Sequence, residues 1–307
     1  MKKNLVSIIM SCYNGEKYLN EAIESVINQS YANWELIFWD NFSSDNSAKI
    51  TKKFNDNRIK YFRSTKKTNL AIARNNAIKK SNGEFICFLD TDDLWLRNKL
   101  KEQINILKKN SLISVTFCNY FIQDERSNII KKYIKFQSVD LSKIKGLIFY
   151  QLLDGYVEGN PLMGPLSVMI RKKILDKKIF DVKLHVFADF DLFLKLSENK
   201  NFQGTNSALA VYRLHQTNES LRSLENYNAE YHFWFNKIKN NPIYNNYHNY
   251  QNILDQIYFQ KFIIYSFAGK FYEMYKILPN IKNYKKKIKL LIIALLPNFF
   301  KKTLYRR

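Results

Sequence analysis

The chain has 307 residues and a formal net charge of +22 at pH 7, and 46% of its residues are hydrophobic. This composition excludes a disordered chain, and the length predicts one compact domain of enzyme size with an additional segment. The positive charge indicates an anionic partner, such as a phosphorylated substrate, an anionic membrane or nucleic acid. The alternative is that the lysines only form a solvated surface.

The N-terminal sequence MKKNLVSIIMSCYNG combines a basic tip with an apolar run, as signal peptides do. Because the run is only about seven residues long and no small-residue cleavage site follows it, we predict a buried first strand instead. Cys12, Cys87 and Cys118 lack the spacing of a disulfide framework or a zinc site. We therefore expect a reducing compartment, the cytoplasm.

Apolar runs and helical patterns alternate along the first third of the chain. Short continuous apolar runs predict buried parallel strands at residues 5–10, 35–39, 59–62 and 85–89. Apolar side chains at helical spacing predict helices between them at residues 19–27, 48–54 and 70–78. Strands that alternate with helices at this spacing are typical of a doubly wound α/β fold.

The rest of the chain is less regular. A helix is predicted at residues 95–107, a strand at 113–120, and a Gly- and Pro-rich loop around GYVEGNPLMGPL that enters a strand at 166–170. Helical spacing returns at 186–196, and a strand-like run follows at 208–212. From about residue 227 the composition shifts to Asn, Tyr, Lys and Phe with helical periodicity. We therefore predict an α/β domain at residues 1–225 and a helical, basic region at 226–307.

Polar side chains follow three of the predicted strands at the points where these strands end. Ser11 and Tyr13 follow the first strand, Asp40 follows the second, and Asp90 and Asp92 follow the fourth. In doubly wound sheets, ligands bind beyond the carboxyl ends of the strands. We therefore expect these side chains to converge on one edge of the sheet.

Asp90 and Asp92 form a D-x-D array directly after an apolar strand. Two carboxylates at this spacing can hold a hard divalent cation, Mg²⁺ or Mn²⁺, that also coordinates phosphate oxygens and turns their mutual repulsion into attraction. The chain has no G-x-G-x-x-G or Walker-type loop, so another element must neutralise any bound phosphate. The alternative is that Asp92 or Asp93 caps a helix that begins near Trp95.

Five motifs occur in order along the chain: S-C-Y-N-G at 11–15, W-D-N-F-S-S-D-N-S at 39–47, A-R-N-N-A at 73–77, G-E-F-I-C-F-L-D-T-D-D at 83–93 and Y-R-L-H at 212–215. Together they resemble glycosyltransferase family 2 of the GT-A fold, most strongly over residues 5–110 and more weakly to about 220. The resemblance implies a Rossmann-like, mostly parallel sheet flanked by helices. It does not cover the tail from residue 227, where the helical periodicity predicts a helical C-terminal extension. The resemblance also implies a nucleotide-sugar donor and an Mg or Mn cofactor.

The resemblance assigns the donor site to residues near the strand ends. Ser11, Tyr13 and Asp40 would line the nucleotide pocket, with Asp40 accepting a hydrogen bond from the base. Arg74 would position the nucleotide or its diphosphate, and Asp90 would contact the nucleotide as well as the metal. Read without the family, Arg74 can equally form a surface salt bridge.

The resemblance also assigns the metal and the catalytic base. Asp90 and Asp92 would bracket the ion, and His215 would contact a phosphate or the ion. The family's later acidic motif matches F-A-D-F-D-L-F-L-K-L at 187–196, which puts Asp189 at the position of the base, with Asp191 as the second candidate. The structural alternative for Asp189 is that it stabilises a helix N-terminus. The structural alternative for His215 is a partly buried imidazole with a hydrogen-bond partner.

Three residues depart from the family's pattern. Asn41 and Phe42 stand where an acidic residue and a glycine are common, and Ala188 stands where a second acidic residue is common. These departures favour the alternative of a degenerate GT-A domain that binds nucleotide or glycan without turnover.

The leading interpretation is a metal-dependent, inverting glycosyltransferase that moves a sugar from a nucleotide diphosphate to a hydroxyl of a cell-surface glycan or lipid-linked precursor. Such a transfer requires one base for the acceptor hydroxyl and one electrophilic clamp for the leaving diphosphate, which a carboxylate and a metal can supply. Inversion is implied by the family alone. Nucleic acid is not expected as a partner, because the edge at residues 90–93 is acidic and the first half has no concentrated basic motif.

Four lysines at positions 285, 286, 287 and 289 precede L-L-I-I-A-L-L-P-N-F-F, and four basic residues follow it. The apolar segment is too short to span a bilayer and is broken by Pro297. Its basic flanks predict an interfacial helix on an anionic membrane surface, at the inner face of the cell membrane. An ordinary core-packing terminal helix is the alternative.

Overall fold

The computed structural model describes the chain except for residues 126–133, 136–138, 158–160, 176–178, 216–217, 219–223, 246, 248–249, 268 and 296–307. The chain divides into two compact units. The α/β unit comprises Met1–Leu152 and Asn160–Leu221, and the helical unit comprises Leu153–Gly159 and Arg222–Arg307. The end of the terminal apolar segment, from residue 296, and the four basic residues that follow it lie outside the described residues.

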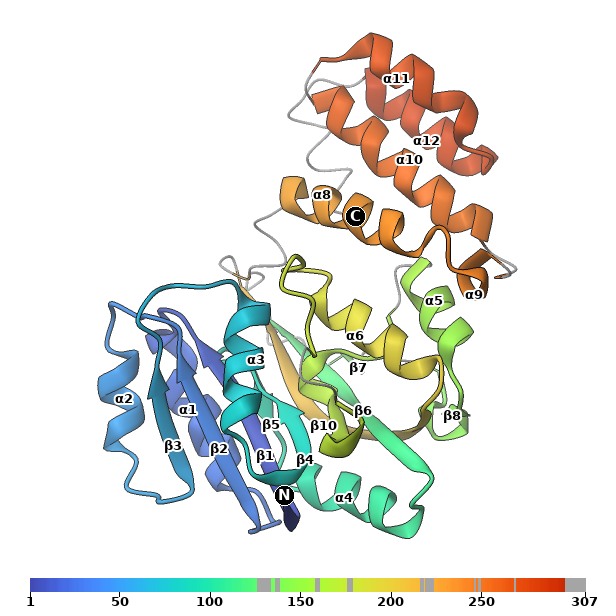
Figure 1. The fold of residues 1–307 in the computed structure, drawn as a ribbon. Coiled ribbons are helices and arrows are strands. Elements are labelled where there is room, and N and C mark those ends of the chain that lie inside the picture. The colour runs from blue at the N-terminus through green and yellow to red at the C-terminus, as the bar shows by residue number, and fades with distance from the viewer. Residues whose placement is uncertain are drawn as a thin grey trace. The chain divides into compact units, whose positions relative to one another are not determined.

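Strands and helices alternate in the first part of the α/β unit, as the apolar pattern predicted (Figure 1). The strands are β1 (Lys2–Cys12), β2 (Trp34–Asp40), β3 (Ile59–Arg63) and β4 (Gly83–Phe88). The helices between them are α1 (Glu16–Ile27), α2 (Ser47–Lys53) and α3 (Leu70–Lys80). Six of the eleven residues of β1 are buried in succession, which explains its continuous apolar run.

The second part of the α/β unit has more short elements. Its strands are β5 (Leu94–Trp95), β6 (Ile113–Asp124), β7 (Ile134–Lys135), β8 (Lys145–Gly146), β9 (Val168–Arg171) and β10 (Asn201–Leu214). Its α-helices are α4 (Lys99–Lys109), α5 (Phe149–Val157), which continues into the helical unit, and α6 (Ala188–Ser197). Short 3₁₀ helices lie at Leu141–Lys143, Pro165–Ser167 and Lys172–Ile174.

Two local predictions in this part are wrong. The helix predicted from residue 95 begins at Lys99, because Leu94 and Trp95 pair with β10 as the short antiparallel strand β5. Gly155 lies in α5 rather than in the predicted Gly- and Pro-rich loop. In both places contacts with residues far along the chain override the local sequence pattern.

The described strands form one ten-stranded sheet in the order β3-β2-β1-β4-β9-β6-β10-β5, with β7 paired to β6 and β8 to β10. Pairing is parallel from β3 through β2 and β1 to β4, and between β6 and β10. Strand β9 runs antiparallel to both β4 and β6, and β5, β7 and β8 are also antiparallel to their partners. The predicted α/β class is confirmed. The parallel part of the sheet contains β1, β2 and β4, the three strands whose ends carry the polar side chains noted in the sequence.

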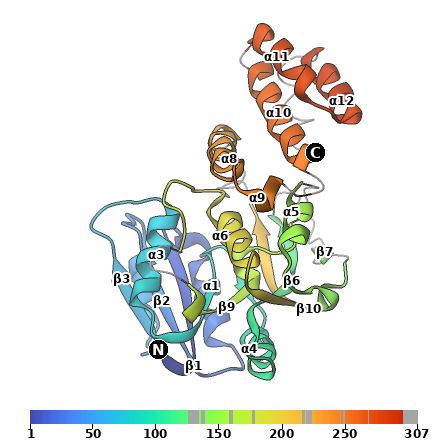
Figure 2. The ribbon, with the colours of Figure 1, turned by 45° about the vertical axis from the view of Figure 1, so that its right-hand side comes forward.

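Helices cover both faces of this sheet. Helices α1 and α4 share one buried apolar cluster with β1, β2 and β4. The buried side chains of α3 belong to the opposite face, and α6 lies on that same side of the sheet (Figures 1 and 2). The side chains that project from α3 and from the start of α6 can therefore meet near the end of β4.

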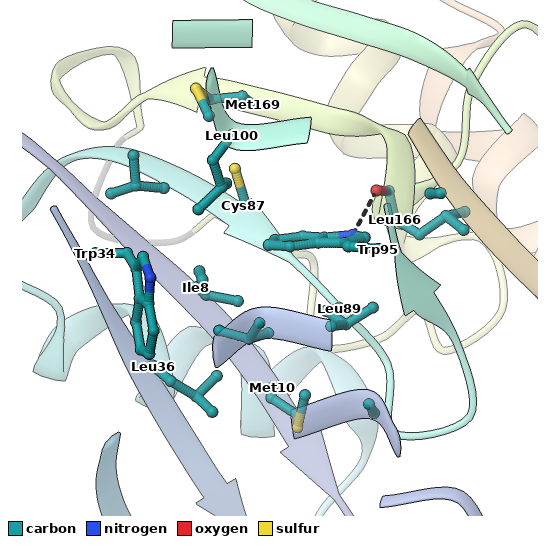
Figure 3. Close-up of a cluster of buried hydrophobic side chains, with 14 of the residues drawn as sticks. Ile8, Met10, Trp34, Leu36, Cys87, Leu89, Trp95, Leu100, Leu166 and Met169 are labelled. Atoms are coloured by element: carbon teal, nitrogen blue, oxygen red, sulfur yellow. Dashed lines mark hydrogen bonds between the residues drawn. The ribbon is translucent and has the colours of Figure 1, made fainter. Parts of the chain in front are cut away.

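The core also fixes the turn that follows β4. The indole nitrogen of Trp95 donates a hydrogen bond of 3.0 Å to the carbonyl oxygen of Leu166, within a cluster that includes Leu89 (Figure 3). Leu89 and Trp95 are both buried. The aspartate-rich turn between them is thus held by the core at both of its ends.

The helical unit contains five described α-helices, α8 (Leu224–Ile238), α9 (Pro242–Asn245), α10 (Tyr250–Phe267), α11 (Phe271–Ile277) and α12 (Tyr284–Leu295), and a 3₁₀ turn at Leu278–Asn280. Buried Asp255 on α10 accepts hydrogen bonds from the backbone amides of Lys282 and Asn283 at 2.8 and 2.6 Å, which fixes the start of α12. Within the described residues, no helix combines the length and the hydropathy that crossing a membrane requires.

A buried carboxylate on β2 ties three strands of the parallel region together. Glu35 accepts hydrogen bonds from the Ser7 hydroxyl on β1 at 2.6 Å, from the backbone amide of Asn82 before β4 at 2.5 Å, and from Lys60 on β3. Burial alone would raise the pKa of Glu35, but the hydrogen bonds from Lys60, Ser7 and Asn82 outweigh it and lower the pKa to about 2.

We expect Glu35→Gln to lower the free energy of unfolding by about 2 kcal/mol at pH 7, because it keeps the shape but loses the attraction to Lys60. The wild-type stabilisation is fully present above the unfolded pKa, near 4.5, and is lost as the pH falls through the folded pKa of about 2. The free energies of unfolding of the wild type and Glu35→Gln, measured between pH 7 and pH 2, should therefore converge as the pH falls.

The matched control is Glu24→Gln on the exposed face of α1, where Glu24 accepts a hydrogen bond from Asn20. This variant should follow the wild type at every pH. A difference between Glu35→Gln and wild type that stays constant down to pH 2 would contradict the assignment.

Candidate active site

A pocket of about 260 Å³ lies within the α/β unit at the end of β4. It is lined by side chains from α3, from the turn after β4, from the start of α6 and from the region around the end of β10. Its charged and polar lining residues are Arg74, Asp90, Asp92, Asp93, His185, Asp189 and Asn218. A concave site with convergent titratable groups is the usual form of a binding or catalytic centre.

Arg74 is the central cation of this pocket. It lies on α3, which begins after Asn69, whose side chain accepts a hydrogen bond from the backbone amide of Ile72. The guanidinium donates from Nη2 to both oxygens of Asp90, at 2.8 and 2.9 Å, and from Nη1 to Oδ1 of Asp189 at 2.5 Å. Because Arg74 is only 2% exposed, its interpretation as a surface salt bridge is wrong.

Burial and charge oppose each other in this trio. Burial raises the pKa of Asp189 above its ordinary value, and the Arg74 charge only partly reverses this effect. Burial alone would lower the pKa of Arg74, but the two carboxylates raise it, so the guanidinium stays charged. Arg74 therefore joins the acidic turn after β4 to the start of α6 through two charge-assisted contacts.

Asp189 lies in the first turn of α6, and so does Asp191. The two carboxylates have different surroundings, because Asp191 is buried and pairs with Lys195 at 2.5 Å, one turn further along the helix. Asp191 is not among the residues that line the pocket. The geometry therefore favours Asp189 over Asp191 as the acidic group that faces a ligand, while its place in the first turn also fits the helix N-terminus interpretation.

Asp92 and His215 meet on the other side of the acidic turn. Oδ2 of Asp92 lies 3.0 Å from Nε2 of His215, whose ring is buried beside Tyr18. Burial raises the pKa of Asp92, and the neighbouring Asp90 charge raises it further. The His215 imidazole thus has a hydrogen-bond partner, as the structural alternative required, and that partner is one of the predicted metal-binding carboxylates.

The helix-cap explanation for the aspartates is wrong. Helix α4 begins at Lys99 after Asn98, and Asp93 instead accepts a hydrogen bond of 3.1 Å from the backbone amide of Arg213 on β10. Asp93 is 2% exposed, and burial together with the charges of Asp92 and Asp90 raises its pKa well above the ordinary value. The acidic turn is therefore not explained by the start of a helix.

Asn218 is a pocket residue that sequence reasoning missed. Its amide nitrogen donates to Oδ2 of Asp92 at 3.3 Å and to the carbonyl oxygen of Arg213 at 3.1 Å. Its amide oxygen accepts a hydrogen bond of 2.5 Å from the backbone amide of His215. The spacing H-x-x-N after the last strand was the available signal, but it becomes informative only when Asp92 is known to lie beside it.

Three of the predicted nucleotide-site residues lie at the ends of β1 and β2. Cys12 and Asp40 are paired in register, so Ser11, Tyr13 and Asp40 occupy neighbouring strand ends. The Ser11 hydroxyl is buried without a hydrogen-bond partner among the described residues. Tyr13 is 45% exposed, and Nζ of Lys67 lies 3.8 Å from its ring centroid.

Asp40 is fully buried, which the sequence did not indicate. Its Oδ1 accepts a hydrogen bond from the backbone amide of Ser43 at 2.7 Å, and its Oδ2 accepts one from the Tyr61 hydroxyl at 2.5 Å. Ser11, Tyr13 and Asp40 are not among the residues that line the pocket around Arg74. The predicted site residues thus form two groups along the same edge of the sheet.

A metal ion in a protein is usually held by several acidic, histidine or cysteine side chains. Among the residues that the structure describes, no three of these are grouped so as to hold a metal ion. Asp90 is engaged by Arg74, while Asp92 and His215 form a pair. A metal ion bound beside Asp90, Asp92 and His215 would therefore need additional ligands from a substrate.

Comparisons with known proteins identify the family of this chain. The family model described as "Glycosyl transferase family 2" matches residues 7–177. The UDP-Glc:alpha-D-GlcNAc-diphosphoundecaprenol beta-1,3-glucosyltransferase WfgD of Escherichia coli is 36% identical over 222 residues, which cover 72% of this chain and 81% of WfgD. The putative teichuronic acid biosynthesis glycosyltransferase TuaG of Bacillus subtilis is 29% identical over 237 residues, which cover 76% of this chain and 87% of TuaG.

Two solved structures share the fold. Residues 1–349 of S. aureus TarS, in complex with UDP-GlcNAc, superpose with a TM-score of 0.63 at 18% identity, covering 90% of this chain and 79% of that one. The mannosyltransferase PcManGT from Pyrobaculum calidifontis, in complex with GDP-Man and Mn²⁺, superposes with a TM-score of 0.57 at 14% identity, covering 76% and 64%. At these identities the likeness concerns the fold alone.

We expect Arg74→Leu to lower the free energy of unfolding by about 3 kcal/mol or more, because it leaves Asp90 and Asp189 without their counter-charge in a partly buried site. Adding Asp189→Asn to the same chain should recover part of the loss, since one uncompensated charge is removed. Urea unfolding of the two variants measures the difference.

Lys143→Gln provides the control, because Lys143 forms an exposed, solvent-screened ion pair with Asp140, and its loss should leave the unfolding curve nearly unchanged. An Arg74→Leu chain as stable as the wild type would show that the guanidinium does not hold the site together.

Proposed function

The chain belongs to glycosyltransferase family 2, and on that basis we propose that it is a metal-dependent, inverting enzyme that transfers a sugar from a uridine diphosphate donor to a hydroxyl group of a lipid-linked glycan precursor or cell-surface glycan. The observation that carries the proposal is the contact of Arg74 with both Asp90 and Asp189 in one pocket. The names of WfgD and TarS support the donor, and the name of WfgD supports the acceptor.

In the proposal, the donor's nucleoside lies across the ends of β1 and β2. Tyr13 offers an exposed ring to the base, and the unpartnered Ser11 hydroxyl offers a hydrogen bond. Asp40 accepts one hydrogen bond at each oxygen from Ser43 and Tyr61, and a carboxylate has about four acceptor sites. Asp40 therefore retains capacity to accept a hydrogen bond from a base N–H.

Asp92 and His215 are the residues that would hold a divalent cation, with Asp90 at its edge. The fit rests on the crowding of these groups, because burial and the Asp90 charge already disfavour an ionised Asp92. Mg²⁺ and Mn²⁺ sites of this kind use one or two carboxylates and take their remaining ligands from substrate phosphates and water. When bound, such an ion would neutralise charge on the leaving diphosphate.

Asp189 is the base in this proposal. The acceptor hydroxyl oxygen forms a bond to the anomeric carbon, the bond from that carbon to the diphosphate oxygen breaks, and the hydroxyl proton passes to Asp189. The raised pKa of Asp189 makes it a stronger base than an exposed aspartate, and its contact with Arg74 fixes its position. A single displacement of this kind needs no enzyme nucleophile and inverts the configuration.

The degenerate alternative rests on three departures from the family's pattern, at Asn41, Phe42 and Ala188. The contacts of Asn41 and the surroundings of Ala188 bear on it. Asn41 donates to the Thr68 carbonyl at 2.7 Å and accepts from the Thr68 hydroxyl at 2.8 Å, so it connects β2 to the segment before α3 and does not leave the site without a function. Ala188 removes one carboxylate but leaves Asp189 in contact with Arg74. These contacts favour turnover over binding alone.

Asp92→Asn and Asp189→Asn form a matched pair that tests the roles. With Mn²⁺ present, we expect Asp92→Asn to lose metal-dependent binding of UDP, because the charge that holds the ion is gone. Asp189→Asn should bind UDP as the wild type does and lose about 10²- to 10⁴-fold in turnover, as expected for removal of a general base. Calorimetric titration and UDP release from UDP-glucose, with and without acceptor, measure both effects.

A wild type that binds UDP but neither transfers nor hydrolyses the donor would favour the degenerate alternative. Equal binding of UDP with and without Mn²⁺ would overturn the metal dependence. An Asp189→Asn variant with full activity would move the base elsewhere.

In the proposal, the helical, basic C-terminal region at residues 226–307 associates with a membrane surface at the cytoplasmic face. On α12, Tyr284, Ile288, Leu291 and Ile292 are exposed and share one face by their spacing, while Leu290 and Ile293 pack into the core. Lysines at 285, 287 and 289 accompany the exposed face, and no acidic residue follows Glu273 in the sequence. An apolar face with basic flanks fits an anionic lipid surface.

We expect the wild type to float with vesicles that contain phosphatidylglycerol and to bind much more weakly to phosphatidylcholine vesicles. The double variant Ile288→Glu/Leu291→Glu should lose binding by about tenfold or more without a change in unfolding temperature, since both side chains are exposed. Leu112→Glu, at an exposed apolar side chain of the α/β unit, is the control and should bind like the wild type. Unchanged flotation of the double variant would overturn the membrane assignment. It would also be overturned if the wild type were a dimer that the double variant converts to a monomer, because the exposed face of α12 would then be a contact between two copies of the chain.

A further inference from the structure

Phe42 has an unusual backbone conformation for an aromatic residue. It follows β2, and its φ of +74° lies in the left-handed region, which disfavours bulky side chains. Its ring is also 48% exposed to solvent. A strained backbone and an exposed apolar ring both cost stability, and a glycine at this position would avoid both costs.

The conformation of Phe42 is held by its two neighbours. The backbone amide of Asn41 donates to the Cys12 carbonyl at 2.7 Å, and its side chain binds Thr68. On the other side, the backbone amide of Ser43 donates to Asp40 at 2.7 Å. Because the chain is fixed immediately before and after Phe42, its backbone cannot relax to a negative φ, and the surroundings maintain the strain.

The Phe42 ring and the buried carboxylate of Asp40 both lie near the guanidinium of Arg63. The guanidinium carbon of Arg63 lies 5.7 Å from the Phe42 ring centroid, and the same guanidinium donates to the Ser43 carbonyl at 2.9 Å and lies 3.9 Å from Asp40. The register of β1 and β2 pairs Cys12 with Asp40, so Tyr13, also exposed, follows on the neighbouring strand end. Two exposed aromatic rings, each beside a cation, thus border this edge of the sheet.

We propose that Phe42 is a binding residue for the nucleobase of the donor and that its ring packs against the flat face of the base. An aromatic heterocycle that carries a diphosphate matches the surroundings, because a base stacks on an aromatic face and the nearby cations Arg63 and Lys67 attract the negative charge. This inference rests on the proposed function, since it concerns the donor site of the same enzyme. It assigns to Phe42 a contribution to affinity that compensates for its cost in stability.

The test compares four chains with phenylalanine, glycine, leucine and tyrosine at position 42, titrated with UDP in the presence of Mn²⁺. Phe42→Gly removes the ring and the strain together, so its unfolding temperature should equal or exceed that of the wild type. Its affinity for UDP should fall about tenfold or more, the loss expected when a stacked base loses its aromatic partner. Phe42→Leu should lose affinity similarly, and Phe42→Tyr should retain it.

Phe42→Leu also controls for loop flexibility, because it keeps a side chain and the restricted backbone but no aromatic face. Inorganic pyrophosphate, which has no base, should bind all four chains equally. Leu112→Ala, at an exposed apolar side chain of the α/β unit outside the proposed donor site, should bind UDP as the wild type does.

Equal UDP affinity of Phe42→Gly and the wild type would overturn the inference and leave the proposed function intact. Weakened binding of UDP-glucose with unchanged binding of UDP would also overturn it, because the ring would then face the sugar. A wild type that binds no nucleoside diphosphate from a panel with uracil, guanine, cytosine and thymine bases would overturn the proposed function and the inference together.

Discussion

The buried guanidinium of Arg74 is the group on which the geometry of the site depends. An unpaired charge at this position would be strongly destabilising, so the fold must supply counter-charges around it. It does so with Asp90, 16 residues away in the sequence, and with Asp189, 115 residues away. The requirement to neutralise one cation therefore fixes α3, the end of β4 and the start of α6 relative to one another.

The acidic turn after β4 imposes the opposite constraint. Asp93 is buried and Asp92 is half-buried beside it, and burial with neighbouring carboxylate charge raises the pKa of each. The core holds both ends of this turn in place through Leu89 and Trp95. Sites that bind cations and phosphates commonly keep such unfavourable charge in the free protein, because the ligand relieves it. Stability and function are thus opposed at this turn, as they are at Phe42.

Much of the fold could be predicted from the sequence, because the parallel strands are continuous apolar runs that alternate with amphipathic helices. The position of Asp90 and Asp92 at a strand end followed from the same pattern. The antiparallel direction of β9 and the existence of β5 could not be predicted, since both depend on pairing with distant strands. The same is true of Asn218, and of the buried state of Arg74 and Asp40, whose partners become neighbours only in the folded sheet.

A crystal structure of the chain with UDP and Mn²⁺ would test the central claim most directly. The uracil is expected at the ends of β1 and β2, and Asp92 and His215 would hold a divalent cation beside the diphosphate. Asp189 is expected to face the open space where an acceptor hydroxyl would approach. A nucleotide bound elsewhere, or a diphosphate held without contact to the acidic turn, would contradict the account.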